Sequence, residues 1–266
     1  MGNCNQCHKK SIKLYLKLLF FRKKNTFKLK LKNYGKHNQK ALLIDATNDV
    51  RVEFLKKTYK HVAGGVLLFV IFEYFLLQSE AVVTFMLSMT EGYKWLIMLG
   101  GFMFITSYAE NTALKTADKN KQYLAYAAYV FMQALIFVPL LYIAIFYTES
   151  GNALIEQAAI VTLGLFVGIS SIVFVTKKDF SFLKAGLSVG FFIAIGLIIA
   201  GSLFGFNLGL WFSVAMCALA AGSILYQTSN LINKFGVEDY IPASLGLFAS
   251  LMLLFWYVLS IFMSRD

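Results

Sequence analysis

Cysteine, histidine and proline are scarce in this sequence, with three cysteines, three histidines and two prolines among 266 residues. Three cysteines cannot build a disulfide framework, and Cys217 lies in an apolar run, as expected of a small hydrophobic side chain. No H-E-x-x-H zinc motif is present, and no histidine lies beyond residue 61 to partner a serine nucleophile. No aspartate lies inside an apolar run. These absences predict a protein that is not an enzyme and that uses no metal or cofactor.

Long apolar runs dominate the sequence after residue 60. The whole chain is 58% hydrophobic, with a mean hydropathy of +0.65, whereas soluble domains are about 45–50% apolar. A helix needs about 20 apolar residues to cross a bilayer. Runs near that length cover residues 61–78, 94–112, 122–147, 153–175, 182–204, 208–229 and 241–263. We predict an all-α membrane protein in which residues 61–266 form a seven-helix transmembrane bundle. Six spans remain if the run at 94–112, whose end is polar, does not cross.

Positive charge is concentrated at the start of the chain. Residues 1–60 hold 16 of the 25 Lys and Arg residues but three of the 14 acidic residues. Anionic lipids of the inner leaflet attract cations beside a membrane by about 1 kcal/mol each. We predict that residues 1–60 form a basic cytoplasmic tail, disordered or on the membrane surface, which contacts anionic lipids rather than nucleic acid. No short signal-peptide core precedes residue 61, so the first helix is expected to act as its own insertion signal.

The remaining charges alternate between successive connections. With the amino terminus in the cytoplasm, 23 of the 25 cations fall on the cytoplasmic side. The opposite side holds two cations and several carboxylates: Lys94, Arg265, Glu80, Glu91, Glu149 and Glu156. Cytoplasmic loops retain Lys and Arg during insertion. We therefore predict a multi-pass protein of the plasma (inner) membrane with a cytoplasmic amino terminus and an external carboxyl terminus.

Short motifs in the basic tail have competing interpretations. Cys4, Cys7 and His8 match the C-x-x-C-H pattern of haem attachment. This segment lacks a secretion signal and enough apolar residues to surround a haem, so we interpret the match as chance. A zinc site would need a second ligand pair, and Gln6 occupies the position where myristoylation requires Ser or Thr. Residues 11–21 fit three interpretations equally: an interfacial helix, a disordered tail, or a start site assigned too far upstream.

Polar side chains inside the predicted spans are the candidate functional groups. A charge at the centre of a membrane helix costs about 2.5–3.5 kcal/mol. Glu73 lies deep in the first span and must face the bundle or a hydrated cavity, as a functional group or as a neutral, hydrogen-bonded carboxyl. Glu110 lies near the end of the second span, where its side chain can reach the interface. Further polar groups, which bond across helices or line a hydrated path, are Gln227, Thr228, Ser229, Asn230 and Ser250.

Four segments in the second half of the chain resemble the Bax inhibitor/YccA family of membrane proteins, most closely its bacterial branch. They are Val175–Lys184, which includes Lys177, Lys178 and Asp179; Ala221–Ile232, which includes Tyr226; Asp239–Ile241; and Ser264–Asp266. The resemblance extends from about residue 50 to residue 266 and leaves the basic tail without a counterpart. It implies six helices around a central seventh, with a cytoplasmic amino terminus.

The resemblance implies two functions. Channel-like members are calcium leak pathways gated by protons through a hydrogen-bonded Asp pair, whose positions match Gln227 and Ser250. Neither an amide nor a hydroxyl titrates near neutral pH, so we expect that gating mechanism to be absent. The bacterial branch implies a substrate and modulator of the membrane-bound AAA protease FtsH, which pulls on cytoplasmic tails.

Our first hypothesis is therefore a protease modulator whose contact surface is the tail and the loop Lys177–Asp179. An unstructured tail suits this role because a processive unfoldase needs a handle. The alternative is an ion leak that uses Glu73 and Glu110, with Gln227 and Ser250 as uncharged lining.

Overall fold

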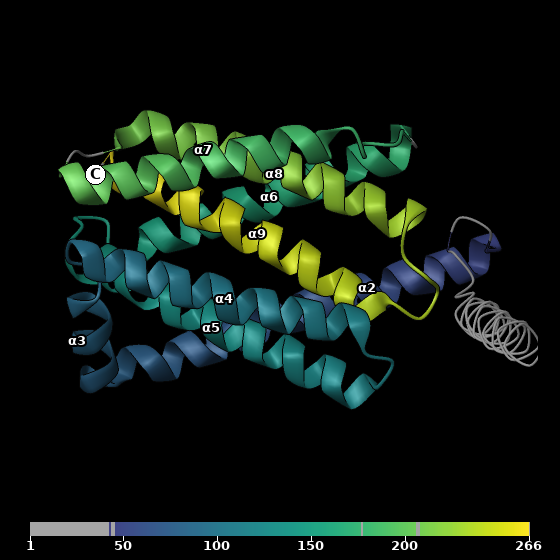
Figure 1. Cartoon of the computed structure of the whole chain (residues 1–266), viewed down its shortest axis with the longest axis horizontal. Coiled ribbons are helices and arrows are strands. Elements are labelled where there is room, and N and C mark those ends of the chain that lie inside the picture. The colour runs from purple at the N-terminus through teal and green to yellow at the C-terminus, as the bar shows by residue number, and fades with distance from the viewer. Residues whose placement is uncertain (1–42, 44–45, 177, 206–207, 266) are drawn as a thin grey trace, which may run out of the picture. The chain divides into compact units, whose positions relative to one another are not determined.

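The computed structural model describes residues 43, 46–176, 178–205 and 208–265, and within these ranges the chain forms eight α-helices (Figure 1). They are α2 (Asn48–Gln78), α3 (Glu80–Ser88), α4 (Tyr93–Lys115), α5 (Lys119–Phe146), α6 (Asn152–Thr176), α7 (Leu183–Phe204), α8 (Gly209–Asn233) and α9 (Tyr240–Met263). Six of them, all except α3 and α4, are long and apolar enough to cross a membrane. The prediction of an all-helical protein is confirmed for the described residues.

Helix α2 begins well before the apolar run that predicted it. The predicted span starts at residue 61, but the helix starts at Asn48, so the tail boundary predicted at residue 60 lies inside it. Asp49 lies in the first turn, where a negative charge favours the helix dipole. Phe54 and Thr58 are buried, so the charged turns also pack against the bundle. The apolar run marks where α2 becomes apolar on all sides, not where the helix begins.

The connection predicted between the first two spans contains a short helix. Val83 and Met86 of α3 pack with Val138 of α5 in a small apolar cluster. Helix α4 matches the predicted second span to within three residues at each end. Polar residues such as Ser107 and Glu110 make α4 less apolar, and α4 is not among the six helices that are long and apolar enough to cross a membrane. The count of seven spans is therefore not settled by length and composition.

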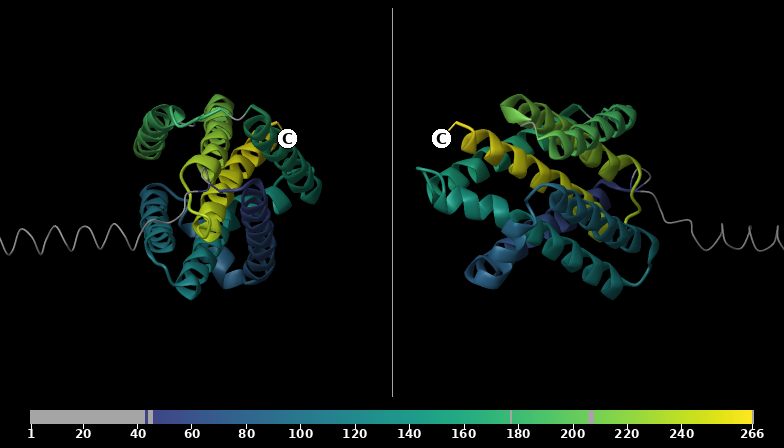
Figure 2. Two further views of the ribbon diagram at one scale, coloured as in Figure 1. Left: turned by 90° about the vertical axis from the view of Figure 1, so that its right-hand side faces the viewer. Right: turned by 60° about the vertical axis from the view of Figure 1, so that its left-hand side comes forward.

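Helix α9 occupies the centre of the bundle. It packs against α2, α4, α5, α6 and α8, and both views in Figure 2 show it running between other helices. Leu247, Phe248 and Leu254 on α9 are fully buried. By contrast, α7, all of whose residues the structure describes, buries Ala194 alone. The central position of the last helix agrees with the arrangement that the family resemblance implies.

The outward surface of the bundle is apolar. Phe104 on α4, Phe192 on α7 and Trp211 on α8 are 76%, 73% and 84% exposed. Isolated apolar residues are common on soluble proteins, but extended apolar surfaces mark sites that contact a partner or a membrane. Helices satisfy their backbone hydrogen bonds internally, as a bilayer requires. The fold is that of a multi-pass membrane protein.

The two ends of the bundle differ in charge. The basic end comprises the first turns of α2 and the connections α4–α5, α6–α7 and α8–α9. Its lysines in those connections and the adjoining helix ends are Lys115, Lys119, Lys121, Lys178, Lys184 and Lys234. The acidic end comprises α3, the connections α5–α6 and α7–α8, and the last turn of α9. Its carboxylates are Glu80, Glu91, Glu149 and Glu156.

Candidate functional site

Helices α8 and α9 pack closely along an antiparallel seam. Gln227 of α8 lies over Gly246 of α9, and one turn further along, Ser223 meets Ser250. A Cβ atom on Gly246 would lie 3.1–3.2 Å from the amide atoms of Gln227. Glycine at this position therefore lets the amide of α8 approach the backbone of α9.

The two positions that match the family's Asp pair, Gln227 and Ser250, are not hydrogen-bonded to each other within these fully described helices. The Ser250 hydroxyl donates to the Gly246 carbonyl at 3.0 Å, and its Oγ lies 2.8 Å from Ser223 Oγ. A hydroxyl has one proton to donate, so Ser223 donates to Ser250. Ser223, which the sequence analysis did not single out, is the partner of Ser250. The seam is built from hydroxyls and an amide and carries no charge.

At the basic end, Ser229 of α8 holds the connection between α6 and α7. Its Oγ accepts a hydrogen bond from the Phe180 backbone N–H at 3.0 Å and donates to Asp179 Oδ1 at 3.3 Å. The same Oδ1 accepts from the Ser181 backbone N–H at 2.9 Å. Ser181 lowers the pKa of the Asp179 carboxyl most, followed by the Ser229 bond and the charge of Lys234. Asp179 is therefore charged at physiological pH.

These contacts bring together two motifs that lie about fifty residues apart in the sequence. Asp179 comes from the first motif and Ser229 from the second. Lys178 is exposed beside them, and Lys234 Nζ lies 5.0 Å from the centre of the Tyr226 ring. Lys177 lies outside the described residues.

Thr228 and Asn230 of the same motif face the interior. The hydroxyls of Tyr59, Ser170 and Thr228, from three different helices, lie near one another. None of the three has a hydrogen-bond partner of ordinary geometry among the described residues, and neither has Asn230 Oδ1. Single hydroxyls in apolar spans are common, so nothing in the sequence distinguished Tyr59 or Ser170. Their significance comes from the packing of α2, α6 and α8.

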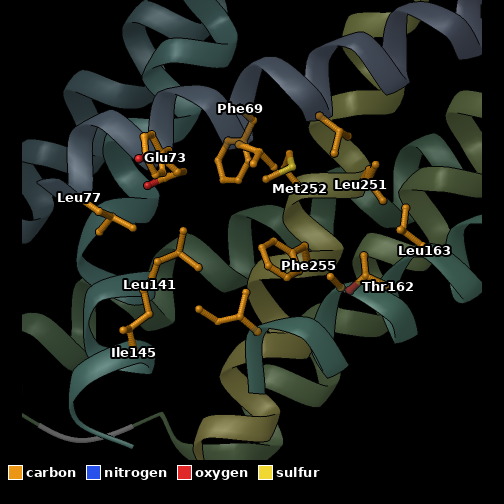
Figure 3. A pocket seen from close by; sticks show the side chains of 15 residues that line it. Phe69, Glu73, Leu77, Leu141, Ile145, Thr162, Leu163, Leu251, Met252 and Phe255 are labelled. Carbon is orange, nitrogen blue, oxygen red and sulfur yellow. The ribbon is translucent and has the colours of Figure 1, made fainter. Parts of the chain in front are cut away.

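Glu73 faces a cavity of about 330 Å³ between α2, α5, α6 and α9 (Figure 3). It is 5% exposed, and neither carboxylate oxygen has a hydrogen-bond partner among the described residues. Thr162 Oγ1, on α6 and also in the cavity wall, likewise lacks one in that part of the chain. Phe69, Leu141 and Phe255 are typical of the rest of the wall, which is apolar. Glu73 is therefore a buried polar group in a hydrocarbon-lined space.

The other predicted groups lie elsewhere. Glu110 is on the exposed face of α4 and does not line the Glu73 cavity. Gln227 and Ser250 do not line it either. Among the described residues, no three His, Cys, Asp or Glu side chains are close enough to hold a metal ion. The tail motif at Cys4, Cys7 and His8 and the segment 11–21 lie outside the described residues.

The fold and the site are those of a multi-pass helical membrane protein with an uncharged seam between α8 and the central helix α9. The chain belongs to the family described as "Inhibitor of apoptosis-promoting Bax1", whose model matches residues 51–266. The family predicted from the sequence is confirmed. Members of this family are generally non-enzymatic membrane proteins.

Individual relatives come from bacteria and animals. The chain is 33% identical to "Modulator of FtsH protease YccA" of Escherichia coli over 64% of this chain and 75% of that protein. It is 35% identical to an uncharacterized protein of Pseudomonas aeruginosa over 42% of this chain and 51% of the relative. It is 31% identical to "Protein lifeguard 4" of mouse over 40% and 45%. The chain thus spans about half the length of the last two relatives.

Proposed function

We propose that this chain is a non-enzymatic inner-membrane protein that binds and modulates a membrane-bound AAA protease of the FtsH type, and is also its substrate, in membrane-protein quality control. The observation that carries the proposal is the similarity to YccA, which extends over three quarters of that protein. Because a shared fold can host several functions, the properties of the seam and of the basic end supply the further support.

The uncharged seam argues against calcium conduction. Calcium takes six to eight oxygen ligands, and carboxylates supply most of the charge that attracts it. Gln227, Ser223 and Ser250 are neutral at every physiological pH. A seam of this composition has no group that binds a proton near neutral pH and no charge that concentrates a cation.

The basic end offers an ordered surface for a cytoplasmic partner. The connection that contains Lys178 and Asp179 is fixed to α8 through Ser229. Lys178 and Lys234 are exposed there. In this proposal they contact the protease, the tail before α2 is the segment that the protease engages, and the tail's cations contact anionic lipids.

The proposal includes seven spans, with α4 as the seventh. Its 23 residues are about 35 Å long at 1.5 Å per residue, which exceeds a hydrocarbon core of about 30 Å. Phe104, Ile105 and Tyr108 on α4 are exposed, and a lipid environment removes them from water. In this proposal the positive charge favours a cytoplasmic location for the basic end, and an odd number of spans then puts the carboxyl terminus outside.

Co-purification from native membranes tests the proposal. The tagged full chain is expected to retain the membrane AAA protease through mild detergent extraction. Replacing Lys178 and Lys234 by Glu is expected to reduce recovery of the protease, because it reverses the charge of the proposed surface. Glu149→Lys, at the acidic end, is the matched control and is expected to leave recovery unchanged. Absence of the protease from the wild-type eluate would reject the proposal.

An ion leak is the alternative, and the unpartnered Glu73 carboxyl is the observation in its favour. The groups that it requires are separated: Glu73 lies in the cavity, Glu110 on the exposed face of α4, and Gln227 and Ser250 in the seam. This separation gives the leak less support than the modulator.

A further inference from the structure

We propose that the Glu73 cavity binds a membrane-soluble amine, with the ammonium group against the Glu73 carboxylate and the alkyl chain along the cavity. This inference is independent of the protease proposal. It assigns a ligand class to a site that the proposed function does not use.

The Glu73 carboxylate is buried without a partner among the described residues. Burying a charged or polar group without a partner is strongly unfavourable. Glu73 is almost fully buried, and no Lys, Arg or His lines its cavity. In the described chain, neither carboxylate oxygen has a hydrogen-bond donor. A bound ammonium would supply both the donor and the opposite charge, and charge-assisted hydrogen bonds are the strong ones.

The wall of the Glu73 cavity is almost entirely apolar. Polar side-chain atoms come from Glu73, Tyr74 and Thr162, and the remaining lining residues are apolar. A volume of about 330 Å³ lies at the lower end of the roughly 300–1,000 Å³ typical of small-molecule sites. Lining residues on α2 run from Val66 to Leu77, about 16 Å along the helix axis. The space is elongated and hydrocarbon-lined, with its one carboxylate on α2.

The Glu73 cavity is accessible from the side of the bundle. Val70, Tyr74 and Leu163 line the cavity and are also exposed on the outside of the bundle. In a membrane this rim faces lipid, so a ligand enters sideways from the bilayer. The sequence pattern predicted that Glu73 lies deep in the first span, but in the structure it lies five residues before the end of α2, about 8 Å from the acidic end. An amphiphile can place its head group at that depth near the interface while its chain follows the cavity inward.

Other occupants fit less well. A calcium ion needs more oxygen ligands than one carboxylate and one threonine hydroxyl provide. Water would find polar partners at Glu73 and Thr162, but it would leave the apolar remainder of the wall without a matching occupant. A fatty acid would place a second carboxylate beside Glu73. A long-chain amine satisfies both the charge and the volume.

The test uses the full chain in phosphatidylcholine nanodiscs and a dodecylamine that carries a photoactivatable diazirine at the chain end. Labelled peptides are identified by mass spectrometry. We expect saturable labelling of the cavity segments of α2, α6 and α9. Unlabelled dodecylamine is expected to compete at least about tenfold more effectively than dodecanol. Dodecanol cannot form the charged contact with Glu73, and loss of a desolvated charge contact weakens binding by at least that factor. Equal competition by dodecanol, or labelling that does not saturate, would overturn the proposal on the wild-type protein alone.

Variants locate the site. Glu73→Gln is expected to weaken dodecylamine competition at least about tenfold, whereas Glu80→Gln, at the exposed start of α3, is expected to leave it unchanged. Ala159→Phe keeps the carboxylate but fills part of the cavity, and is expected to abolish labelling of α6. Unchanged labelling in a correctly folded Ala159→Phe protein would place the bound amine elsewhere and overturn the proposal.

Discussion

Ser250 donates its hydroxyl proton to a backbone carbonyl of its own helix and accepts one from Ser223. A carboxylate at position 250 would keep the bond from Ser223 but would lie beside the Gly246 carbonyl. A carboxylate at position 227 would lie over the same residue. The two acidic groups would then be about one helical turn apart, where the negative charge of one raises the carboxyl pKa of the other and favours binding of a proton.

The flux of Ca²⁺ and protons into proteoliposomes tests this interpretation. The native protein is expected to give no flux above empty vesicles between about pH 5 and 8, because amides and hydroxyls do not titrate there. The double variant Gln227→Asp, Ser250→Asp is expected to conduct in a pH-dependent manner. Conduction by the native protein would show that the uncharged seam does not prevent a leak, and Glu73 would be the next residue to replace.

Asp179 gives a prediction on pH dependence. Its pKa is lowered in the folded protein, so its stabilising bonds are fully present above the ordinary Asp value of about 3.9. They are lost as the pH falls through the lower folded value. Hydrogen exchange of the Phe180 and Ser181 amides is measured as protection factors, which correct for the intrinsic effect of pH on exchange. These protection factors are expected to stay constant from neutral pH to about 4 and then fall.

Two variants control this measurement. Ser229→Ala removes the acceptor of the Phe180 N–H and is expected to lower protection at that amide at all pH values. Asp118→Ala removes a helix cap at the start of α5 and is expected to leave Phe180 unaffected. Loss of protection already at about pH 6 would mean that another group holds this connection.

At the scale of elements, the packing of α8 on α9 depends on Gly246. Gly246→Val places methyl groups where the Gln227 amide lies, and overpacking of this kind costs about 1–3 kcal/mol. We expect a thermal transition several degrees lower in detergent, with partial recovery in the double variant Gly246→Val, Gln227→Ala. Gly164→Val is the matched control because a Cβ at Gly164 meets no atom within 4 Å. Equal destabilisation by both single substitutions would implicate loss of glycine itself rather than the seam.

The elements show how far the sequence determines the fold. Apolar runs located seven of the described helices because helix length in a bilayer is set by its thickness. They missed α3, which is too short to span, and the first turns of α2, whose charged residues interrupt the apolar pattern while Phe54 and Thr58 remain buried. Hydropathy measures the solvent that a segment prefers, so it does not detect helices that lie outside the hydrocarbon.

The site was less predictable than the helices. Glu73 stood out because an isolated carboxylate in a span is rare, but the cavity beside it is formed by four helices and has no local signal. Ser250 was paired with Gln227 by analogy, whereas the register of α8 on α9 pairs it with Ser223. Contacts between helices depend on register and rotation, and neither is encoded in the hydropathy of one segment.

At the scale of the whole molecule, the number of spans decides whether the two termini lie on the same side. Cysteines introduced as Glu91→Cys and Ala117→Cys flank α4 in a protein whose Cys4, Cys7 and Cys217 are replaced by Ser. If α4 spans, an impermeant maleimide applied to intact spheroplasts is expected to label position 91 and to label position 117 only after permeabilisation. Labelling of both positions from one side would place α4 on the membrane surface and reduce the count to six.

Modulation of a membrane AAA protease can be measured with purified components. The full chain is reconstituted with FtsH in proteoliposomes, and the rate at which a reference membrane substrate is degraded is measured. The rate is expected to fall as the amount of this chain rises, and the chain itself is expected to be slowly degraded. Lys178→Glu with Lys234→Glu is expected to weaken both effects, whereas Glu149→Lys is not. A degradation rate independent of the chain, with the chain left intact, would show that the chain neither modulates the protease nor is its substrate.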